Sequence, residues 1–332
     1  MQGKAPLAPN APIDIHVGID VCKAWLDVYF HPAGETFRFA NDADGLKRLK
    51  REFARFRVVR VVMEATAKFH RLAHRNLHDS GFAVAVINPA RGRCFADALG
   101  TIAKTDRIDA RVLALFSEAI DPRASAPCSL VLEQAQELVG ARQNAVADRT
   151  AFVNQRGAAT TSFLRAELKR RIDAAGTFIK RLEAEIARLI ETDPAMARRV
   201  EILESIPGIG TITAVALAVG LAELGSVTNK KIALLVGLAP VARDSGDTSG
   251  KRHIEGGREH VRTAVYMAAV TAARCNEDLK AFYDRLVANG KLAKVALAAV
   301  MRKLVVLGNT LITENRLWTP IRPVNNLHKC PV

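Results

Sequence analysis

The order of short apolar segments between residues 13 and 120 constrains the fold more than any other feature of the chain. Apolar and polar residues alternate in three stretches, IDIHVGID, AWLDVYF and ETFRFAN, and HPAG separates the second from the third. Such alternation predicts strands, and connections this short predict an antiparallel meander. The rest alternates between helix and strand: a helix over DADGLKRLKREFARF, the strand RVVRVVMEA, a helix over about 68–79, the strand FAVAVINP, and helices over CFADAL and TDRIDARVLALF. Residues 13–120 are therefore predicted to form an α/β domain.

Strand signals end near residue 128, and Leu, Arg, Glu and Lys dominate residues 129–198. Apolar residues recur there at spacings of three and four, at Leu168, Ile172, Ala175, Ile179, Leu182, Ile186 and Leu189. This heptad stripe predicts a coiled-coil hairpin or a dimerising arm, and a helix packed inside its own chain explains it equally well. Asp193-Pro194 is expected to break the arm.

Residues 200–312 are predicted to form an all-α domain. Apolar helices flank the turn IPGIG, and the segments VTNKKIALLVGL and GREHVRTAVYMAAVTAAR have helical patterns. Between these two segments, APVARDSGDTSGKRHIEGG is too rich in Gly, Ser, Asp and Thr for regular structure, and such loops often carry function. The tails at 1–12 and 318–332 are expected to be disordered.

The formal charge of +14 predicts a polyanionic partner, either nucleic acid or an anionic membrane surface. Membrane insertion is disfavoured, because the longest apolar run, Ile212–Leu221, is too short to span a bilayer and no signal peptide is visible. The five cysteines are scattered, with no Cys-x-x-Cys pair. They indicate reduced thiols in a cytoplasmic protein, and neither a disulfide framework nor a zinc site.

Two acids end apolar strands, Asp20 in VGID and Glu64 in VVMEA. The element order is that of the ribonuclease-H-like fold, whose first and fourth strands are neighbours, so these carboxylates are expected to converge. Asp106 and Asp109 lie three residues apart, about 5–6 Å on one helix face, and can close over the same spot. Two like charges about 4 Å apart cost roughly 4 kcal/mol at an effective dielectric near 20, so a counter-ion is expected. Carboxylates favour Mg²⁺ or Mn²⁺, and a pair of such ions can activate both oxygens of a phosphodiester exchange.

Other acids and histidines have simpler explanations. Aspartate is favoured in the first turn of any helix, which could account for Asp106 and Asp109 without a metal. Asp27 is left out of the cluster, because alternation predicts it to be exposed. Three histidines recur at every fourth position, His70, His74 and His78. No carboxylate or cysteine at a suitable offset accompanies them, so they are predicted to line a solvated or phosphate-facing surface.

The turn in LESIPGIGTITA contains Gly208 and Gly210. A dinucleotide-binding motif is excluded, because Thr213 stands where the third glycine belongs and no strand precedes it. A turn whose backbone N–H groups hold a nucleic-acid phosphate fits better, and the alternative is a plain turn between packed helices.

The segment RDSGDTSGKR places Ser245 and Ser249 among basic residues: Arg243, Lys251 and Arg252, with Arg258 and Arg262 further on. This composition indicates a phosphate-binding loop. A hydroxyl without a base or metal is a poor nucleophile, so composition alone favours turn residues for both serines.

Six blocks in this order and spacing resemble the DEDD-type transposases of the insertion sequence 110 and 1111 families: VGIDVCKAWLDV, VVMEAT, VAVINPARGRCFADALGTIAKTDRIDARVLA, LESIPGIGTITA, LVGLAPVARDSGDTSGKRHIEGGREHVRTAVYMAA and ANGKLAKVALAAVMRKL. The resemblance covers nearly the whole chain. It places the catalytic tetrad of that family on Asp20, Glu64, Asp106 and Asp109, and its catalytic serine on Ser245.

The sequence departs from many relatives directly after Glu64. Those relatives have a glycine and an aromatic residue there, whereas EATAKFH has Ala67 and Phe69. The departure concerns the local turn and none of the implied metal ligands.

The resemblance implies an enzyme that recombines a mobile DNA element. The N-terminal domain would be RuvC-like, similar to Holliday-junction resolvases, the middle a coiled coil, and the C-terminal domain would carry the serine. Ser245 would bond covalently to a DNA phosphate and release a 3′ hydroxyl, with assistance from metal held by the carboxylates. The implied partners are donor and target DNA, a noncoding bridge RNA, and further copies of the chain, as a dimer that assembles to a tetramer with composite active sites. The enzyme would act in the cytoplasm, associated with the nucleoid.

Three alternatives remain open from the sequence. A site-specific DNA invertase would use the same chemistry for a different outcome. A metal-dependent junction endonuclease would hydrolyse DNA with water and leave Ser245 as a loop residue. A nucleic-acid-binding protein without catalysis would need only the basic charge and the glycine turn.

Overall fold

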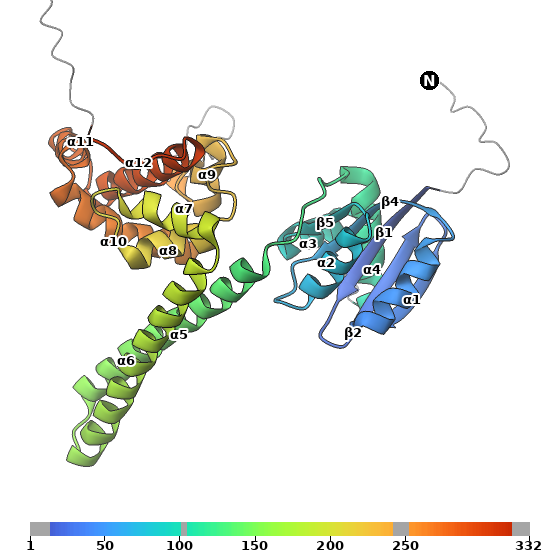
Figure 1. Cartoon of the computed structure of the whole chain (residues 1–332), viewed down its shortest axis with the longest axis horizontal. Coiled ribbons are helices and arrows are strands. Elements are labelled where there is room, and N and C mark those ends of the chain that lie inside the picture. Colours follow the sequence, from blue (N-terminus) through green and yellow to red (C-terminus); the bar gives the residue numbers. More distant parts are fainter. Residues whose placement is uncertain (1–13, 101–104, 242–251, 321–332) are drawn as a thin grey trace, which may run out of the picture. The chain divides into compact units, whose positions relative to one another are not determined.

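The computed structural model describes residues 14–100, 105–241 and 252–320, with residues 106 and 107 described by their backbone only. It contains two compact units, Met1–Cys128 and Ser129–Val332 (Figure 1). The first unit is an α/β structure and the second is almost entirely helical. The α/β character predicted for the N-terminal part and the helical character predicted for the remainder are therefore confirmed.

The first unit is built on a five-stranded mixed sheet in the order β3-β2-β1-β4-β5. Its strands are β1 (Asp14–Val21), β2 (Trp25–His31), β3 (Glu35–Ala40), β4 (Arg57–Glu64) and β5 (Val84–Ile87). The strands β1, β2 and β3 form the predicted antiparallel meander, while β4 runs parallel to both β1 and β5. The described residues of the unit also form four helices: α1 (Ala43–Phe53), α2 (His70–Asp79), α3 (Pro89–Ala98) and α4 (Asp106–Ile120).

The two faces of this sheet pack against different helices, because side chains alternate along each strand. Ile15, Val17 and Ile19 of β1 share one buried cluster with residues of α1 and α2. On the opposite face, Val62 of β4 packs with Leu113 of α4 in a smaller cluster that also contains residues of β5. The sheet is thus the middle layer between two pairs of helices.

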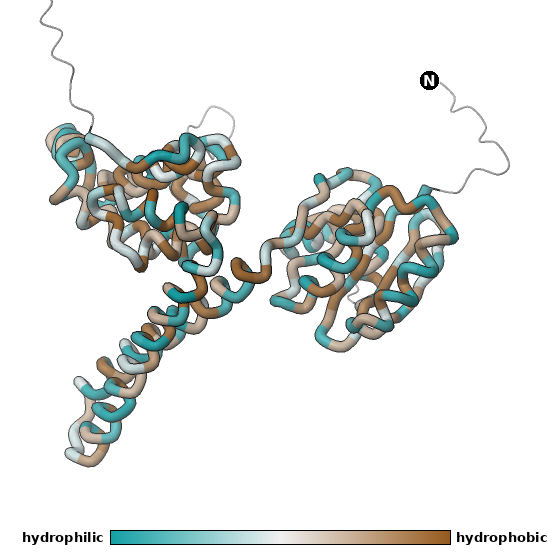
Figure 2. The backbone as a smooth tube through the Cα atoms, viewed as in Figure 1, coloured by the Kyte–Doolittle hydropathy of each residue, from teal (hydrophilic) through white to brown (hydrophobic). Residues whose placement is uncertain are grey.

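The second unit begins with a hairpin of two long helices, α5 (Leu130–Ala158) and α6 (Ser162–Glu191), which lie side by side (Figure 1). The hydroxyl groups of Ser129 and Thr161 cap their first turns. The predicted heptad stripe supplies most of the buried residues of α6, and apolar segments recur along both helices in Figure 2. At the base of the hairpin, Ile186 and Leu189 join the core of the neighbouring helices. The stripe therefore packs within its own chain, and dimerisation through the hairpin stays a prediction.

Within the described part of the second unit, six further helices pack around one large core. They are α7 (Pro194–Glu204), α8 (Thr211–Gly220), α9 (Asn229–Val236), α10 (Glu259–Cys275), α11 (Glu277–Ala288) and α12 (Ala293–Thr313). The prediction of an all-α domain is wrong in one detail. A short antiparallel ladder pairs β6 (Pro240–Val241) with β7 (His253–Ile254). It joins the two ends of the segment that contains Ser245, and two pairs of residues are too few to give a strand pattern in the sequence.

Helix α12 is long and apolar enough to cross a membrane by length and composition, which was not expected from the apolar runs of the sequence. One face of α12 lies in the core of the second unit, with Val300, Leu304 and Leu311 buried. Asn309, also buried, accepts from the backbone N–H of Gly225 and donates to Val227 and Asn229. These contacts are those of a core helix in a globular unit.

Candidate functional site

Asp20 and Glu64 lie at the same edge of the sheet. Ile19 of β1 is the register partner of Met63 in the parallel strand β4, and the two acids are the next residues along each strand. Both side chains are partly buried. The predicted convergence of these strand ends is therefore present in the fold.

Helix α4 crosses β1 in unusually close contact, at Gly18. A Cβ atom at this position would lie 2.0 Å from the carbonyl oxygen of Ala110 and 2.4 Å from the backbone nitrogen of Ala114. Only a glycine allows this approach. Because Gly18 and Asp20 point to the same face of β1, the first turns of α4 cover the face that carries Asp20.

The N-terminal turn of α4 carries the other two acids of the predicted tetrad. Thr105 caps the helix, and Asp106 and Asp109 occupy its first and fourth positions. Asp109 is partly buried and directly precedes Ala110. The side chain of Asp106 lies outside the described residues.

Helix α3 packs against the carboxylate of Glu64. A Cβ atom on Gly92 would lie 2.3 Å from Glu64 Oε1, so the absence of a side chain at Gly92 makes room for this oxygen. Three residues after Glu64, Ala67 has a φ of 44°. This is the left-handed region that glycine adopts most easily, so the departure from the family pattern falls on a strained turn.

The carboxylates match the donor chemistry of a magnesium or manganese site, but they do not form a complete one in the described structure. Among the side chains described, no group of three or more His, Cys, Asp or Glu residues is arranged to hold a metal ion. Asp20, Glu64 and Asp109 come from elements that meet at one sheet edge, and all supply hard oxygen ligands. The residues present fit a divalent cation in type, and the metal site stays a prediction.

The exposure expected for Asp27 is wrong. Its residue is 5% exposed, and its carboxylate accepts two hydrogen bonds from Arg38, Nε to Oδ1 at 2.9 Å and Nη2 to Oδ2 at 2.8 Å. Asp27 is the register partner of Asp20, so both side chains point to the face beneath α4. The alternation in WLDVYFH placed Asp27 correctly opposite its apolar neighbours, but α4 covers that second face as well.

Of the histidines in α2, His74 differs from the sequence-based expectation. His74 is 7% exposed, and its Nε2 lies 2.7 Å from the carbonyl oxygen of Ser125. Its ring contacts that of the exposed His78 edge to face. His74 is therefore a core residue that fixes the end of the first unit against α2, and it does not line a phosphate-facing surface.

His16 lies further along the face of β1 that α4 covers. Its Nδ1 lies 3.0 Å from the hydroxyl oxygen of Ser117 in α4. Burial lowers the pKa of His16, and nearby His31 and Arg60 act in the same direction, whereas Glu118 and Asp121 oppose them. The folded protein therefore favours the neutral imidazole.

The stability of the first unit is expected to fall as pH drops below about 6.5, the ordinary pKa of histidine. Since the folded state has the lower pKa, the unfolded chain binds the proton first, and each step down in pH toward the folded pKa favours unfolding. In a Trp318→Phe background, Trp25 is the only tryptophan and reports on this unit alone. Urea titrations at pH 7.5 and 5.5 should show a smaller midpoint shift in His16→Gln than in the parent, while His78→Gln should match the parent. Equal shifts in parent and His16→Gln would contradict the expectation.

The glycine turn of the second unit has a packing role. Gly208 has a φ of 104°, and a Cβ there would lie 2.6 Å from the Cα of Ala272 in α10. Gly210 is the N-cap residue of α8, and no side chain caps this helix. A Cβ at Gly210 would have no neighbouring atom within 4 Å. The close contact explains Gly208 as a turn between packed helices, whereas phosphate binding at Gly210 stays a prediction.

Two of the arginines assigned to nucleic acid have partners inside the chain. Arg258 donates to both carboxylate oxygens of Glu223, at 2.6 and 2.7 Å, and to the carbonyl of Gly220. Burial raises the pKa of Glu223, but the hydrogen bonds from Arg258, a backbone hydrogen bond and the positive charges of Arg258 and Lys231 together hold the pKa below its ordinary value. Arg262 donates to the carbonyls of Val236 and Gly256. These contacts fasten the start of α10 to the neighbouring helices, and a role in DNA binding stays a prediction.

The other residues predicted around the serine are mostly undescribed. Arg252 is exposed, next to β7. Arg243, Ser245, Ser249 and Lys251 lie outside the described residues.

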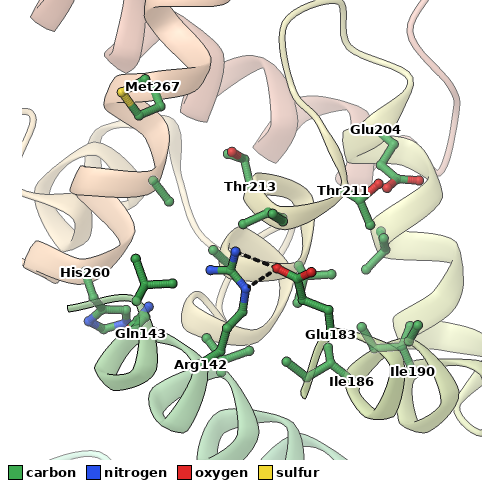
Figure 3. Close-up of a pocket in the computed structure, with 18 of the residues that line it drawn as sticks. Arg142, Gln143, Glu183, Ile186, Ile190, Glu204, Thr211, Thr213, His260 and Met267 are labelled. Atoms are coloured by element: carbon green, nitrogen blue, oxygen red, sulfur yellow. Dashed lines mark hydrogen bonds and ion pairs between the residues drawn. The ribbon is translucent and has the colours of Figure 1, made fainter. Parts of the chain in front are cut away.

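A cavity of about 1020 Å³ in the second unit is a groove bordered by α5, α6, α7, α8 and α10 (Figure 3). Most of its lining is apolar, and Ile212 and Met267 in it are exposed. An ion pair from Arg142 Nε to Glu183 Oε1, 2.8 Å long, joins α5 to α6 within the groove. No pattern in the sequence indicates this groove, because its walls come together only when five separate helices pack.

Comparisons with known proteins match two separate regions of the chain. Residues 17–162 match a model of the DEDD transposases of the IS110 kind, and residues 200–284 match the model described as "Transposase IS116/IS110/IS902 family". The pilin gene-inverting proteins of Moraxella bovis and Moraxella lacunata are 27% and 28% identical to this chain, each over 91% of it and 96% of their own length. An uncharacterised 44.8 kDa protein of insertion element IS116 from Streptomyces clavuligerus is 30% identical over 54% of this chain and 44% of its own.

The two matched regions contain the sites described above. The first contains the end of the sheet that carries Asp20 and Glu64 together with the start of α4, which we call the carboxylate edge. The second contains the glycine turn and the start of α10. Transposases cleave and rejoin DNA, which fits the acidic sheet edge and the basic charge of the chain. The chain belongs to the IS116/IS110/IS902 family of transposases.

Proposed function

We propose that the chain is an RNA-guided recombinase that cuts and rejoins DNA through a covalent bond to Ser245, with Mg²⁺ or Mn²⁺ held by Asp20, Glu64, Asp106 and Asp109. The observation that carries the proposal is the sheet edge where Asp20 and Glu64 end neighbouring parallel strands beneath α4. The strand order β3-β2-β1-β4-β5 supports a ribonuclease-H-like, RuvC-like domain.

The proposed reaction is a transesterification. The Ser245 oxygen forms a bond to phosphorus and loses its proton, while the bond from phosphorus to the 3′ oxygen breaks and that oxygen leaves as a hydroxyl. When bound, the divalent ion acts as a Lewis acid that favours loss of the serine proton and stabilises charge on the phosphate and leaving oxygens. The role of the chain is to orient four carboxylates at one edge and to present the serine. Rejoining reverses these steps with a 3′ hydroxyl of another strand.

The partners follow from the family resemblance and from the surface of the chain. The net charge of +14 supports binding of donor DNA, target DNA and a bridge RNA. The α5–α6 hairpin exposes large apolar side chains, Phe163 at 74% and Phe178 at 49%, which supports contact with another copy of the chain. We therefore propose a dimer that assembles to a tetramer and acts on DNA in the cytoplasm.

DNA inversion is a second candidate outcome. The relatives named pilin gene-inverting proteins match over 91% of this chain and 96% of their own length. Insertion and inversion need the same cleavage and rejoining steps and differ in how the two DNA sites are arranged. The carboxylate edge is compatible with either.

A recombination assay tests the proposed function. Purified protein with its bound RNA is incubated with Mg²⁺ and a supercoiled plasmid that carries the DNA flanking its gene, and new junctions are sequenced. Chelation by EDTA, or the change Glu64→Gln, is expected to reduce junction formation by at least about 10²-fold, because charge stabilisation at the phosphate is lost. Digestion of the RNA before the reaction should have a comparable effect. Sequenced junctions distinguish insertion from inversion.

The matched control is Asp14→Asn, which removes a carboxylate from the other end of the same strand as Asp20. It should leave junction formation within about twofold of the parent, because Asp14 takes part in an exposed ion pair with Arg57, and such pairs contribute little to stability. Junctions that form equally well in EDTA would refute the metal role, and junctions that survive RNA digestion would refute guidance by RNA.

A further inference from the structure

An ion pair with a buried carboxylate, between Asp27 and Arg38, lies on the sheet face that carries Asp20 and has no place in the reaction described so far. Residues directly opposite each other in β1, β2 and β3 form a row, Asp20, Asp27 and Arg38. Opposed residues in antiparallel strands share a face, so all three lie on the side covered by α4. The charges along this row are negative, negative and positive.

The geometry of the pair holds Arg38 in one orientation. Its Nε and Nη2 donate to the two oxygens of Asp27 at 2.9 and 2.8 Å, a bidentate arrangement of charge-assisted hydrogen bonds. The Asp27 side chain is 7% exposed, whereas that of Arg38 is 50% exposed. A buried carboxylate therefore anchors the inner edge of a guanidinium that remains accessible to solvent.

The space beside the pair is open and lies close to the predicted metal ligands. A cavity of about 210 Å³ is lined by both partners and by Thr36 and Ala110, among others. Ala110 follows Asp109 in α4. The cavity thus adjoins the turn of α4 that supplies the tetrad, and the only cation lining it belongs to Arg38 within the described residues.

We propose that Arg38, oriented by Asp27, binds a phosphate of the DNA substrate beside the carboxylate edge. The inference rests on the proposed function, because it assumes that DNA approaches this edge. An arginine is suited to this task, since its planar fork matches phosphate oxygens and stays charged at all physiological pH values. Asp27 is a positioning residue: it acts on DNA only through the guanidinium.

The test measures binding of a fluorescent four-way DNA junction without divalent ions, at several salt concentrations, with full-length protein. Arg38→Gln is expected to weaken binding about tenfold and to lower the slope of log affinity against log salt by about 0.9, the value for one lost phosphate contact. Arg38→Lys keeps the charge but loses the fork, so it should retain the slope and lose affinity severalfold. Trp25 fluorescence in the Trp318→Phe background verifies folding, and Arg38→Lys decides the test if Arg38→Gln unfolds.

The variant Asp27→Asn shows whether DNA affinity depends on the orientation of Arg38 or only on the net charge of the protein. Removal of a negative charge near DNA should tighten binding if only charge matters, whereas the proposal expects weaker binding because Arg38 loses its anchor. The control is Arg57→Gln, which breaks an arginine–aspartate pair at the opposite end of β1 and β4 and should leave the slope unchanged. An unchanged slope and affinity in Arg38→Gln, or tighter binding by Asp27→Asn, would overturn this inference alone. Failure of the parent protein to bind the junction would overturn the proposed function with it.

Discussion

Ser245→Ala is expected to eliminate the covalent protein–DNA adduct and to lower recombination by at least about 10³-fold, the scale on which loss of a catalytic nucleophile acts. The physical reason is that no other atom of the side chain can replace the hydroxyl oxygen in the bond to phosphorus. The adduct is measured by denaturing electrophoresis of protein incubated with end-labelled DNA and Mg²⁺. Labelled DNA should migrate with the parent protein and run free with Ser245→Ala.

Ser249→Ala is the matched control, because Ser249 lies four residues away in the same segment. It should retain the adduct. Comparison with Asp109→Asn then separates the chemical alternatives. If Ser245→Ala still cleaves DNA and Asp109→Asn does not, water is the nucleophile and the protein is a metal-dependent nuclease. If both variants and the parent bind DNA without cleaving it, the protein acts by binding alone.

The elements of the first unit could be predicted from the sequence because each strand or helix has its own periodicity. Alternation in β1, β2 and β3 and the apolar spacing of α4 gave the correct order of elements, and the order made β1 and β4 neighbours. The placement of Asp20 and Glu64 at strand ends followed directly. Local patterns were sufficient here because they gave the order of elements, and this order implies that β1 and β4 are neighbours.

The burial of Asp27 could not be predicted from the same pattern. Alternation tells which residues of a strand share a face, but it does not tell how each face is covered. In this sheet α4 packs closely over β1, so Asp27 is buried where it would be exposed in an open sheet, whereas Arg38 in β3 stays half exposed. Gly18 is the residue in the sequence that carries this information, because it marks the position of close helix approach.

The second unit was harder to interpret for a related reason. Composition around Ser245 indicates phosphate binding, yet Arg258 and Arg262 use their guanidinium groups to hold Glu223 and backbone carbonyls. A basic residue that fastens two helices and one that contacts DNA look alike in a sequence. Only the internal partners separate them, and those partners lie 35 and 26 residues away for Glu223 and Val236.

Gly18→Ala is expected to lower the rate of DNA cleavage about 10²-fold under conditions in which the variant is still folded. The new Cβ would lie 2.0 Å from Ala110 O and 2.4 Å from Ala114 N, and both are backbone atoms that no side-chain rotation can move. Helix α4 must therefore shift outward by on the order of 1 Å, which costs about 1–3 kcal/mol of stability as in other overpacked sites. The shift moves Asp106 and Asp109 away from Asp20 and Glu64. A displacement of roughly 1 Å in reacting groups can lower the rate about 10²-fold.

Val17→Ala is the control that isolates this effect. Val17 is fully buried beside Gly18 but faces the opposite helices, so its truncation should cost about 2 kcal/mol without moving α4. Unfolding of both variants is followed by Trp25 fluorescence in the Trp318→Phe background, and cleavage is measured below both transitions. If Gly18→Ala and Val17→Ala lose stability equally but only Gly18→Ala loses cleavage, the position of α4 sets the geometry of the carboxylates. Equal cleavage by the two variants would mean that α4 does not contribute to the site, and the assignment of Asp106 and Asp109 would fail with it.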